Sequence, residues 1–152
     1  MTQIQPPIQS FDELQKLFKA RVELDNAQFG IKSLYLPNPI FTPTQKYCLI
    51  AMEPSWVDQD RISRGFKNFV GGEGDSILQD CAYTFLCHDS FDYHITDISK
   101  GAVRTEEAKV KRNIRRANWL SLLKQELEFF GNPSVITIGR IDNDLKKAGI
   151  KV

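Results

Sequence analysis

Two acidic residues lie at the ends of apolar runs of the sequence, at places where a carboxylate can take part in a reaction. Glu53 comes directly after the run Tyr47–Met52, and Asp97 lies near the end of the run Tyr93–Ile98. If these runs are neighbouring strands of a parallel sheet, about 4.8 Å apart, both side chains can flank one ligand beyond the carboxyl ends of the strands. A carboxylate there can orient water or stabilise developing positive charge. Two carboxylates that close raise each other's pKa, and burial against Phe69 would add to this effect, so we expect one of them, Asp97, to stay protonated near neutral pH.

The first part of the chain is predicted to form a helix and a surface crossing. Ser10 and Glu13 are spaced as a capping box, which predicts a helix from there to about Asn26. The prolines between 36 and 43 exclude a helix or a central strand. Asp75 is predicted to cap a later helix. The apolar face of that helix is formed by Ile77, Leu78, Cys81, Ala82, Phe85 and Leu86.

Strands and helices alternate in the rest of the chain. Strands buried on both faces are predicted from the continuous apolar runs at Tyr47–Met52, Tyr93–Ile98 and Val135–Ile138. A helical region is predicted from about Thr105 to Gly131, and a short helix over 142–147, after which 150–152 begin what resembles a fourth strand. The longer helical region carries an apolar stripe of Trp119, Leu120, Leu123, Leu127 and Phe130.

This alternation is typical of a parallel sheet that carries helices on both faces. We therefore expect an α/β fold, a three-layer α/β/α arrangement with a central, mostly parallel sheet. The 152 residues suit one domain. Residues 1–45 would form the N-terminal helix and proline-rich crossing, and 46–152 the core.

Composition excludes several classes of protein. The three cysteines include no CxxC pair, so their spacing suits neither a disulfide framework nor a four-cysteine metal site. We predict no metal and no cofactor. The N-terminus carries no apolar run typical of a signal peptide, and no apolar stretch approaches the roughly 18 residues that span a bilayer. The expected location is the cytoplasm, without membrane association.

Four segments, in order and with suitable spacing, resemble motifs of the uracil-DNA glycosylase superfamily. Ala51-Met52-Glu53-Pro54-Ser55 is similar to its first motif, a strand followed by a polar residue and proline. Residues 69–78 resemble the stretch Phe-Val-Gly-x-x-Gly-x-x-Leu of the iron–sulfur branch, and 93–100 resemble its strand Tyr-Ile-Thr-Asn followed by lysine. Residues 119–140 resemble its helix and Gly-Arg-terminated strand. The likeness covers roughly Cys48 to Val152 and implies a uracil-DNA glycosylase-like fold.

Two parts of the family pattern are absent from the sequence. The cysteine quartet of the iron–sulfur branch is missing, which again predicts no cluster. The family's His-Pro-Ser loop, which steadies negative charge on the departing base, would lie after one more strand, beyond Val152. We therefore expect a fold that lacks the last strand of the family. The chain would then be a fragment, or a partner would complete its site, or the fold would serve binding rather than catalysis.

The resemblance implies hydrolysis of the N-glycosidic bond of a flipped uracil or a related damaged base. Glu53 takes the catalytic position, where the family has Asp or Asn, and its oxygens are displaced by about an ångström. Met52 and Pro54 belong to the same base-binding motif. Phe69 takes the place of the aromatic platform on which a flipped base stacks. The alternatives are that Glu53 caps the following segment and that Phe69 is a core anchor.

Asp97 stands where the family has asparagine, and this difference bears directly on which base the site would recognise. The family's asparagine reads uracil with one acceptor and one donor, whereas an ionised aspartate only accepts and would repel the uracil O4. A protonated aspartate can instead donate to a ring nitrogen and accept from an exocyclic amine, as cytosine requires. We therefore expect a weak preference for uracil. The alternative is that Asp97 pairs with Lys100 or caps the following turn.

A basic run between Lys100 and Arg116 predicts DNA as the partner. It holds seven basic residues and two acidic ones, a net charge of +5, which suits a phosphate backbone. The predicted DNA contacts are Lys100, Lys111, Arg112, Arg115 and Arg116. The alternative is a solvated helix face.

Two other functions remain open at this point. The first is a catalytically inactive module of the same fold that binds nucleic acid or a nucleotide. The second is a small-molecule hydrolase on an α/β sheet, but the sequence has no G-x-S-x-G elbow, P-loop or G-x-G-x-x-G to support it. The base-excision glycosylase is the preferred interpretation.

Overall fold

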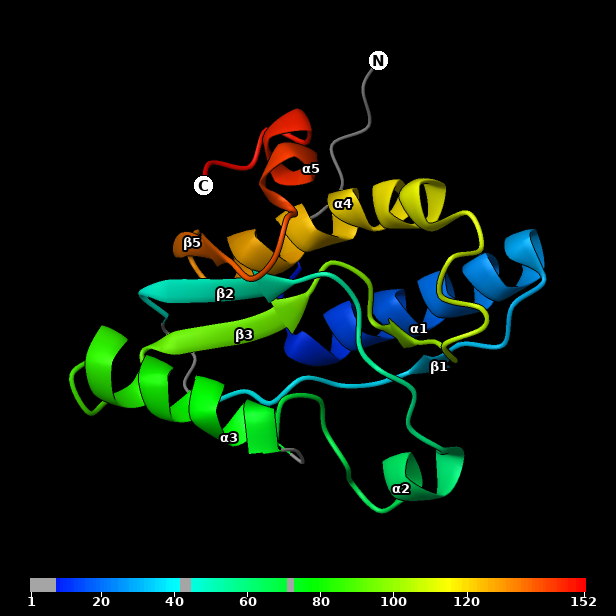
Figure 1. Cartoon of the computed structure of the whole chain (residues 1–152). Coiled ribbons are helices and arrows are strands. Elements are labelled where there is room, and N and C mark those ends of the chain that lie inside the picture. The colour runs from blue at the N-terminus through cyan, green and yellow to red at the C-terminus, as the bar shows by residue number, and fades with distance from the viewer. Residues whose placement is uncertain (1–7, 42–44, 71–72) are drawn as a thin grey trace.

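A three-stranded parallel sheet forms the centre of this mixed α/β protein (Figure 1). The computed structural model describes residues 8–41, 45–70 and 73–152. Strand β2 (Tyr47–Ala51) lies between β3 (Tyr93–Asp97) and β5 (Ser134–Thr137), and all three run in the same direction. The predicted adjacency and parallel direction of these strands are confirmed. The apolar runs form strands because helices cover both faces of β2 and β3.

The two faces of the sheet pack against different helices. Cys48 and Ile50 of β2 lie in one core with residues of α1 (Phe11–Phe29), α4 (Arg112–Phe129) and α5 (Asp142–Lys147). We call it the α1–α4 core. The residue between them, Leu49, points to the opposite face, as the two-residue period of a strand requires. It packs there with α3 (Glu73–Asp80) and the π-helix Cys81–Leu86 that continues α3.

The predicted start of the first helix is confirmed, and one half of the predicted capping box forms. The Ser10 hydroxyl accepts a hydrogen bond from the Glu13 backbone N–H at 3.2 Å, and the Glu13 carboxylate accepts one from the Gln9 N–H at 3.2 Å. The first contact satisfies a free amide of the first turn, whereas the Glu13 carboxylate binds the amide of the residue before the cap rather than the Ser10 N–H that a capping box uses. The helix runs to Phe29, a little past the predicted end, and Gly30 closes it with a φ of +64°.

Three predicted boundaries are wrong. Asp75 does not cap its helix, because α3 already begins at Glu73. Residues 105–111 form turns, and α4 begins only at Arg112. Residues 150–152 form no fourth strand, because the Ile150 N–H bonds the Leu145 carbonyl at the end of α5 and its side chain is buried in the α1–α4 core.

The apolar face predicted for the helix after residue 75 is largely exposed. Ile77 and Phe85 are 62% and 76% exposed, whereas Ala82 is buried. The prediction assumed a regular α-helix, but from Cys81 onward the chain forms a π-helix. Its wider turns carry Phe85 out of phase with the 3.6-residue period. Ile77 lies in the regular helix α3, where Leu78 rather than Ile77 packs against the core.

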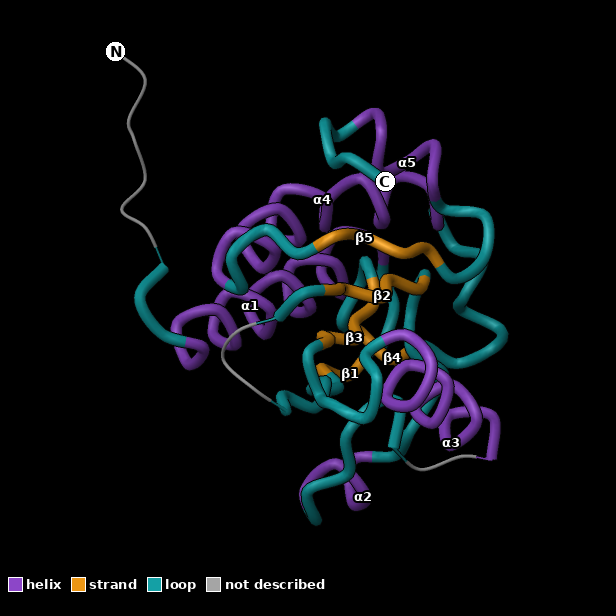
Figure 2. The backbone as a smooth tube through the Cα atoms, turned by 90° about the vertical axis from the view of Figure 1, so that its left-hand side faces the viewer, coloured by secondary structure: helices purple, strands orange, loops and turns teal. Residues whose placement is uncertain are grey.

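Three short elements were not predicted, and they surround the carboxyl end of the sheet. Helix α2 (Gln59–Ser63) is capped by the Asp58 side chain. Strand β1 (Leu34–Tyr35) pairs antiparallel with β4 (Gly101–Ala102), beside β3 (Figure 2). Two-residue strands carry no periodic pattern that a sequence could reveal. No helix in the described part of the chain is both long and apolar enough to span a bilayer.

Candidate active site at the carboxyl end of the sheet

Glu53 and Asp97 lie at the carboxyl ends of two neighbouring parallel strands. Asp97 is the last residue of β3 and is in register with Ala51, the last residue of β2. Glu53 follows two residues later. The two segments remain in contact beyond the strands, because the Ile98 N–H bonds the Ala51 carbonyl at 2.9 Å. The fold thus brings the two predicted carboxylates to one edge of the sheet.

The Asp97 carboxyl group is buried and bonded to an asparagine that sequence reasoning missed. Asp97 is 2% exposed, and its Oδ2 accepts a hydrogen bond from Asn68 Nδ2 at 2.5 Å. Asn68 also donates to Asn38 Oδ1 at 3.3 Å, and Asn38 Nδ2 donates to Thr96 Oγ1 at 2.9 Å. The two asparagines come from separate loops. In the sequence, only the position of Asn38 between two prolines and of Asn68 before Phe69 distinguishes them from other polar loop residues.

Burial raises the pKa of Asp97 to about 7, against the opposing effects of the Lys100 ammonium and the Asn68 hydrogen bond. The carboxylates of Glu53 and Glu126 add smaller upward contributions. The expected direction of the pKa shift is confirmed, and burial, which was expected only to add to the pairing of carboxylates, is its largest cause. Both protonation states of Asp97 are therefore populated near neutral pH.

Glu53 is held by two arginines at the start of α4. Its Oε2 lies 3.3 Å from Arg115 Nη1, and its Oε1 lies 3.7 Å from Arg112 Nε. The Arg115 side chain is 3% exposed, and it also donates to the carbonyls of Val110 and Ala108 at 2.7 and 2.8 Å. Arg115 thereby joins the turns before α4 to the carboxylate.

The basic run therefore does not form one solvated face. Lys100 and Arg115, two of the predicted DNA contacts, are 1% and 2% exposed and lie inside the protein. Arg116 pairs with Asp144 at 2.7 Å. Lys111 is exposed and Arg112 half-buried. These positions leave Lys111 and part of Arg112 accessible to a phosphate.

Lys100 belongs to a buried group of charges between β3 and α4. Its Nζ lies 2.9 Å from Glu126 Oε1 and also donates to the backbone carbonyl of Asp97. Glu126 Oε2 lies 2.7 Å from His94 Nε2. Burial alone would raise the pKa of Glu126, but the Lys100 ammonium and the His94 hydrogen bond hold it at about 2. The predicted pairing of Asp97 with Lys100 is thus made by the Asp97 backbone carbonyl.

Phe69 is a core anchor in this structure, the alternative that the sequence left open. It is 8% exposed and packs with Leu49, Tyr93 and Ile95. Its φ of +64° is unusual for a bulky side chain. The conformation is fixed by hydrogen bonds from the Phe69 N–H to Asn68 Oδ1 at 3.1 Å and from Gln79 Nε2 to the Phe69 carbonyl at 3.0 Å.

The other members of the predicted motifs contribute mainly to the framework. Pro54 is buried, and Met52 packs at the edge of the α1–α4 core. Gly71 and Gly72, in the motif that begins at Phe69, lie outside the described residues. Trp56, just beyond Pro54, stacks with Arg104, whose guanidinium carbon lies 4.5 Å from the ring centre. This stack places an aromatic ring and an exposed cation beside the carboxyl end of the sheet.

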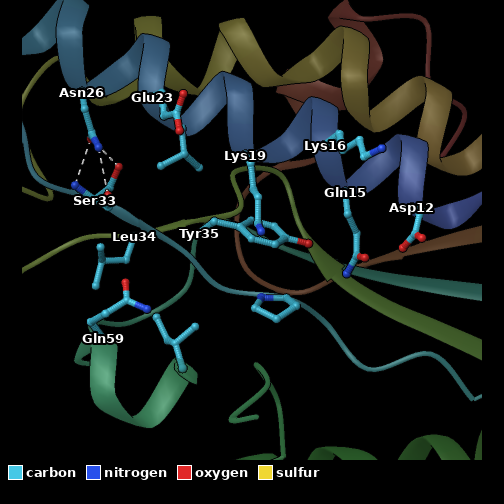
Figure 3. Close-up of a pocket in the computed structure, with 13 residues that line it drawn as sticks. Asp12, Gln15, Lys16, Lys19, Glu23, Asn26, Ser33, Leu34, Tyr35 and Gln59 are labelled. Atoms are coloured by element: carbon cyan, nitrogen blue, oxygen red, sulfur yellow. Dashed lines mark hydrogen bonds between the residues drawn. The ribbon is translucent and has the colours of Figure 1, made fainter. Parts of the chain in front are cut away.

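A cavity of about 750 Å³ lies at a different place, between α1, β1 and α2 (Figure 3). The Lys19 side chain in its lining points toward the Tyr35 ring, with Lys19 Nζ 6.0 Å from the ring centre. Burial raises the pKa of Tyr35 to about 12, so its hydroxyl keeps its proton at neutral pH. No residue predicted from the sequence as functional lines this cavity.

Within the described ranges, no three His, Cys, Asp or Glu side chains are grouped as metal ligands would be. The comparison with models of known protein families gives no match, and the comparison with curated proteins gives none either. The likeness to uracil-DNA glycosylases therefore rests on the four sequence motifs alone.

Proposed function

We propose that this protein is a glycosylase-like hydrolase that releases a flipped base at the carboxyl end of its parallel sheet. One observation carries the proposal. Two carboxyl groups from neighbouring strand ends, Glu53 and Asp97, differ sharply in environment, one held by arginines and the other buried with its pKa raised to about 7. Such pairs are typical of acid–base sites.

Glu53 is the group that acts on the sugar. Positive charge grows on the sugar as the glycosidic bond weakens, and a carboxylate stabilises that charge and orients water. The water oxygen forms a bond with C1′ of the sugar and the C1′–N bond breaks. The base leaves with the electron pair and takes up one proton, which balances the proton that the water loses. Arg112 and Arg115 keep the carboxylate in place between the strand end and α4. Asp97 reads the edge of the base.

The same ion pairs support a second function, a module that binds DNA without cutting it. Each Glu53 oxygen has a guanidinium neighbour, and a carboxylate engaged in this way is a weaker partner for water. Under this alternative, Glu53 organises the loop and Asp97 alone meets the base.

Base release from oligonucleotides that carry uracil or cytosine distinguishes the two functions. We expect release by the natural chain and loss of release with unchanged DNA affinity in Glu53→Gln. Glu128→Gln is the matched control, because Glu128 is exposed on α4. DNA binding without release of any base would favour the binding module.

A further inference from the structure

We infer that Asn68 determines the base specificity of this site, because it occupies one oxygen of Asp97 and leaves the other to read the base. The inference rests on the proposed function, but its first test needs no substrate. It begins from the geometry of a single amide group.

The orientation of the Asn68 amide is fixed by a backbone donor. The Phe69 N–H can only donate, so the atom facing it at 3.1 Å is the Asn68 oxygen. The amide nitrogen consequently faces Asp97 Oδ2 at 2.5 Å and Asn38 Oδ1 at 3.3 Å. Both amide hydrogens are then engaged, and Asp97 Oδ2 is bound as an acceptor.

The backbone around Asn68 is fixed as firmly as its side chain. The Asn68 N–H bonds the Pro37 carbonyl at 2.8 Å, and Gln79 holds the Phe69 carbonyl. Phe69 keeps a left-handed φ despite its bulk, and a strained conformation persists only where its surroundings determine it. These contacts hold Asn68 beside the end of β3, where its amide group reaches Asp97.

A proton that binds Asp97 therefore goes to Oδ1. Oδ2 accepts from Asn68, and a carbonyl oxygen accepts better than a hydroxyl oxygen does. Oδ1 is an acceptor when Asp97 is ionised and a donor when it is protonated. The groups that face Asp97 are Asn68, Lys100, Glu53 and Glu126, and burial among them keeps the pKa near 7, so both forms occur near neutral pH.

Asp97 therefore contacts the base through Oδ1 alone, and we call this arrangement the single-oxygen reader. It discriminates between two classes of base edge. A uracil-type edge presents a ring N–H, which needs the acceptor of the ionised form. A cytosine-type edge presents a ring nitrogen acceptor, which needs the donor of the protonated form. The preferred base should therefore change from the cytosine type to the uracil type as the pH rises through the Asp97 midpoint.

The first experiment follows the Asp97 carboxyl carbon by NMR in the free protein. In Asn68→Asp, a near-isosteric change that keeps the acceptor for the Phe69 N–H, two carboxyl groups share one site, so the Asp97 midpoint should rise by about one pH unit or more. Asn68→Ala removes the hydrogen-bond donor and should raise the Asp97 midpoint by a smaller amount. This second variant keeps the test valid if Asn68→Asp folds poorly. Asn143→Asp adds the same charge at an exposed position and should leave the midpoint unchanged. An unchanged midpoint in both Asn68 variants would overturn the inference.

The second experiment measures the affinity of oligonucleotides carrying uracil or cytosine by fluorescence anisotropy across the same pH range. The ratio of the two affinities should change by about ten-fold, and its midpoint should move upward in Asn68→Asp. Asp97→Asn cannot titrate and should give a flat ratio. A ratio independent of pH in the natural chain would refute the single-oxygen reader. Base release, assayed on the same samples, reports separately on hydrolysis. If the preferred base changes with pH but no base is released, the specificity inference stands and only the proposed catalytic function is contradicted.

Discussion

Arg115 lies 3.3 Å from Glu53 and is buried on α4 with all three of its guanidinium nitrogens engaged. Replacing it by methionine leaves Glu53 with Arg112 alone and removes the Arg115 donor from the Val110 carbonyl, whereas the Ala108 carbonyl keeps Arg112 Nε at 3.1 Å. Because breaking a buried ion pair leaves unpaired groups, Arg115→Met should lower the free energy of unfolding by about 2–4 kcal/mol. Urea denaturation measures this change. Arg140→Met makes the same substitution at an exposed position and should cost little, and equal losses in the two variants would argue against the role of Arg115.

The two buried carboxylates should give the protein an acid-shifted stability optimum. The pKa of Glu126 is lowered from 4.5 to about 2, so its contribution is complete above about pH 4.5 and is lost as the pH falls through about 2. The pKa of Asp97 is raised from 3.8 to about 7, so the folded state binds the extra proton and stability falls as the pH rises toward 7.

We therefore expect the free energy of unfolding to be about 2–3 kcal/mol lower at about pH 8 than at about pH 5. Asp97→Asn should remove this decrease, because the amide does not titrate. Urea denaturation at the two pH values tests the sign. A natural chain that is more stable at the higher pH would show that Asp97 is ionised without penalty.

Phe69 should behave as a core residue. Phe69→Ala removes a buried ring and should cost about 3 kcal/mol of stability or more. Phe85→Ala is the control, because Phe85 is 76% exposed. Thermal denaturation compares the two variants. If Phe69→Ala kept its stability but lost affinity for DNA, the ring would be a stacking platform after all.

DNA affinity should depend on the exposed cations beside the strand ends. Arg104, Lys109 and Lys111 are exposed, whereas Arg116 already pairs with Asp144. Replacing the first three by alanine should reduce the salt dependence of binding by about 0.9 in log–log slope for each phosphate that these side chains neutralise. Arg116→Ala should change the slope little.

Fluorescence anisotropy at several salt concentrations gives these slopes. A matched triple replacement of exposed lysines on other elements takes Lys16, Lys124 and Lys147 to alanine. If this control flattens the slope as much as the first triple variant does, the attraction comes from the whole protein rather than from the strand ends.

The sheet could be predicted from the sequence because its strands are continuous apolar runs. Tyr47–Ala51 and Tyr93–Asp97 pair as expected, and with them Glu53 and Asp97 come to the same edge. The capping box at Ser10 also fixed the start of α1. These features are local, or follow from the rule that parallel strands end at one edge.

The rest of the site depends on contacts between distant segments. Asn38 and Asn68 are polar loop residues that meet Asp97 only after folding. Arg115 belongs to a run of basic residues, and nothing in the run marks it as the member that turns inward to Glu53. The exposure of Phe85 could not be predicted, because the π-helix that follows α3 gives no periodic signal of its own.

Single-turnover reaction of excess protein with a uracil-containing oligonucleotide tests the central claim most directly. Mass spectrometry of the products counts free uracil and abasic strands. The proposed function predicts that the two appear in equal amounts with the natural chain, and that Glu53→Gln binds the same oligonucleotide but releases neither. An oligonucleotide that is bound and stays intact, in the natural chain as in Glu53→Gln, would contradict hydrolysis at this site.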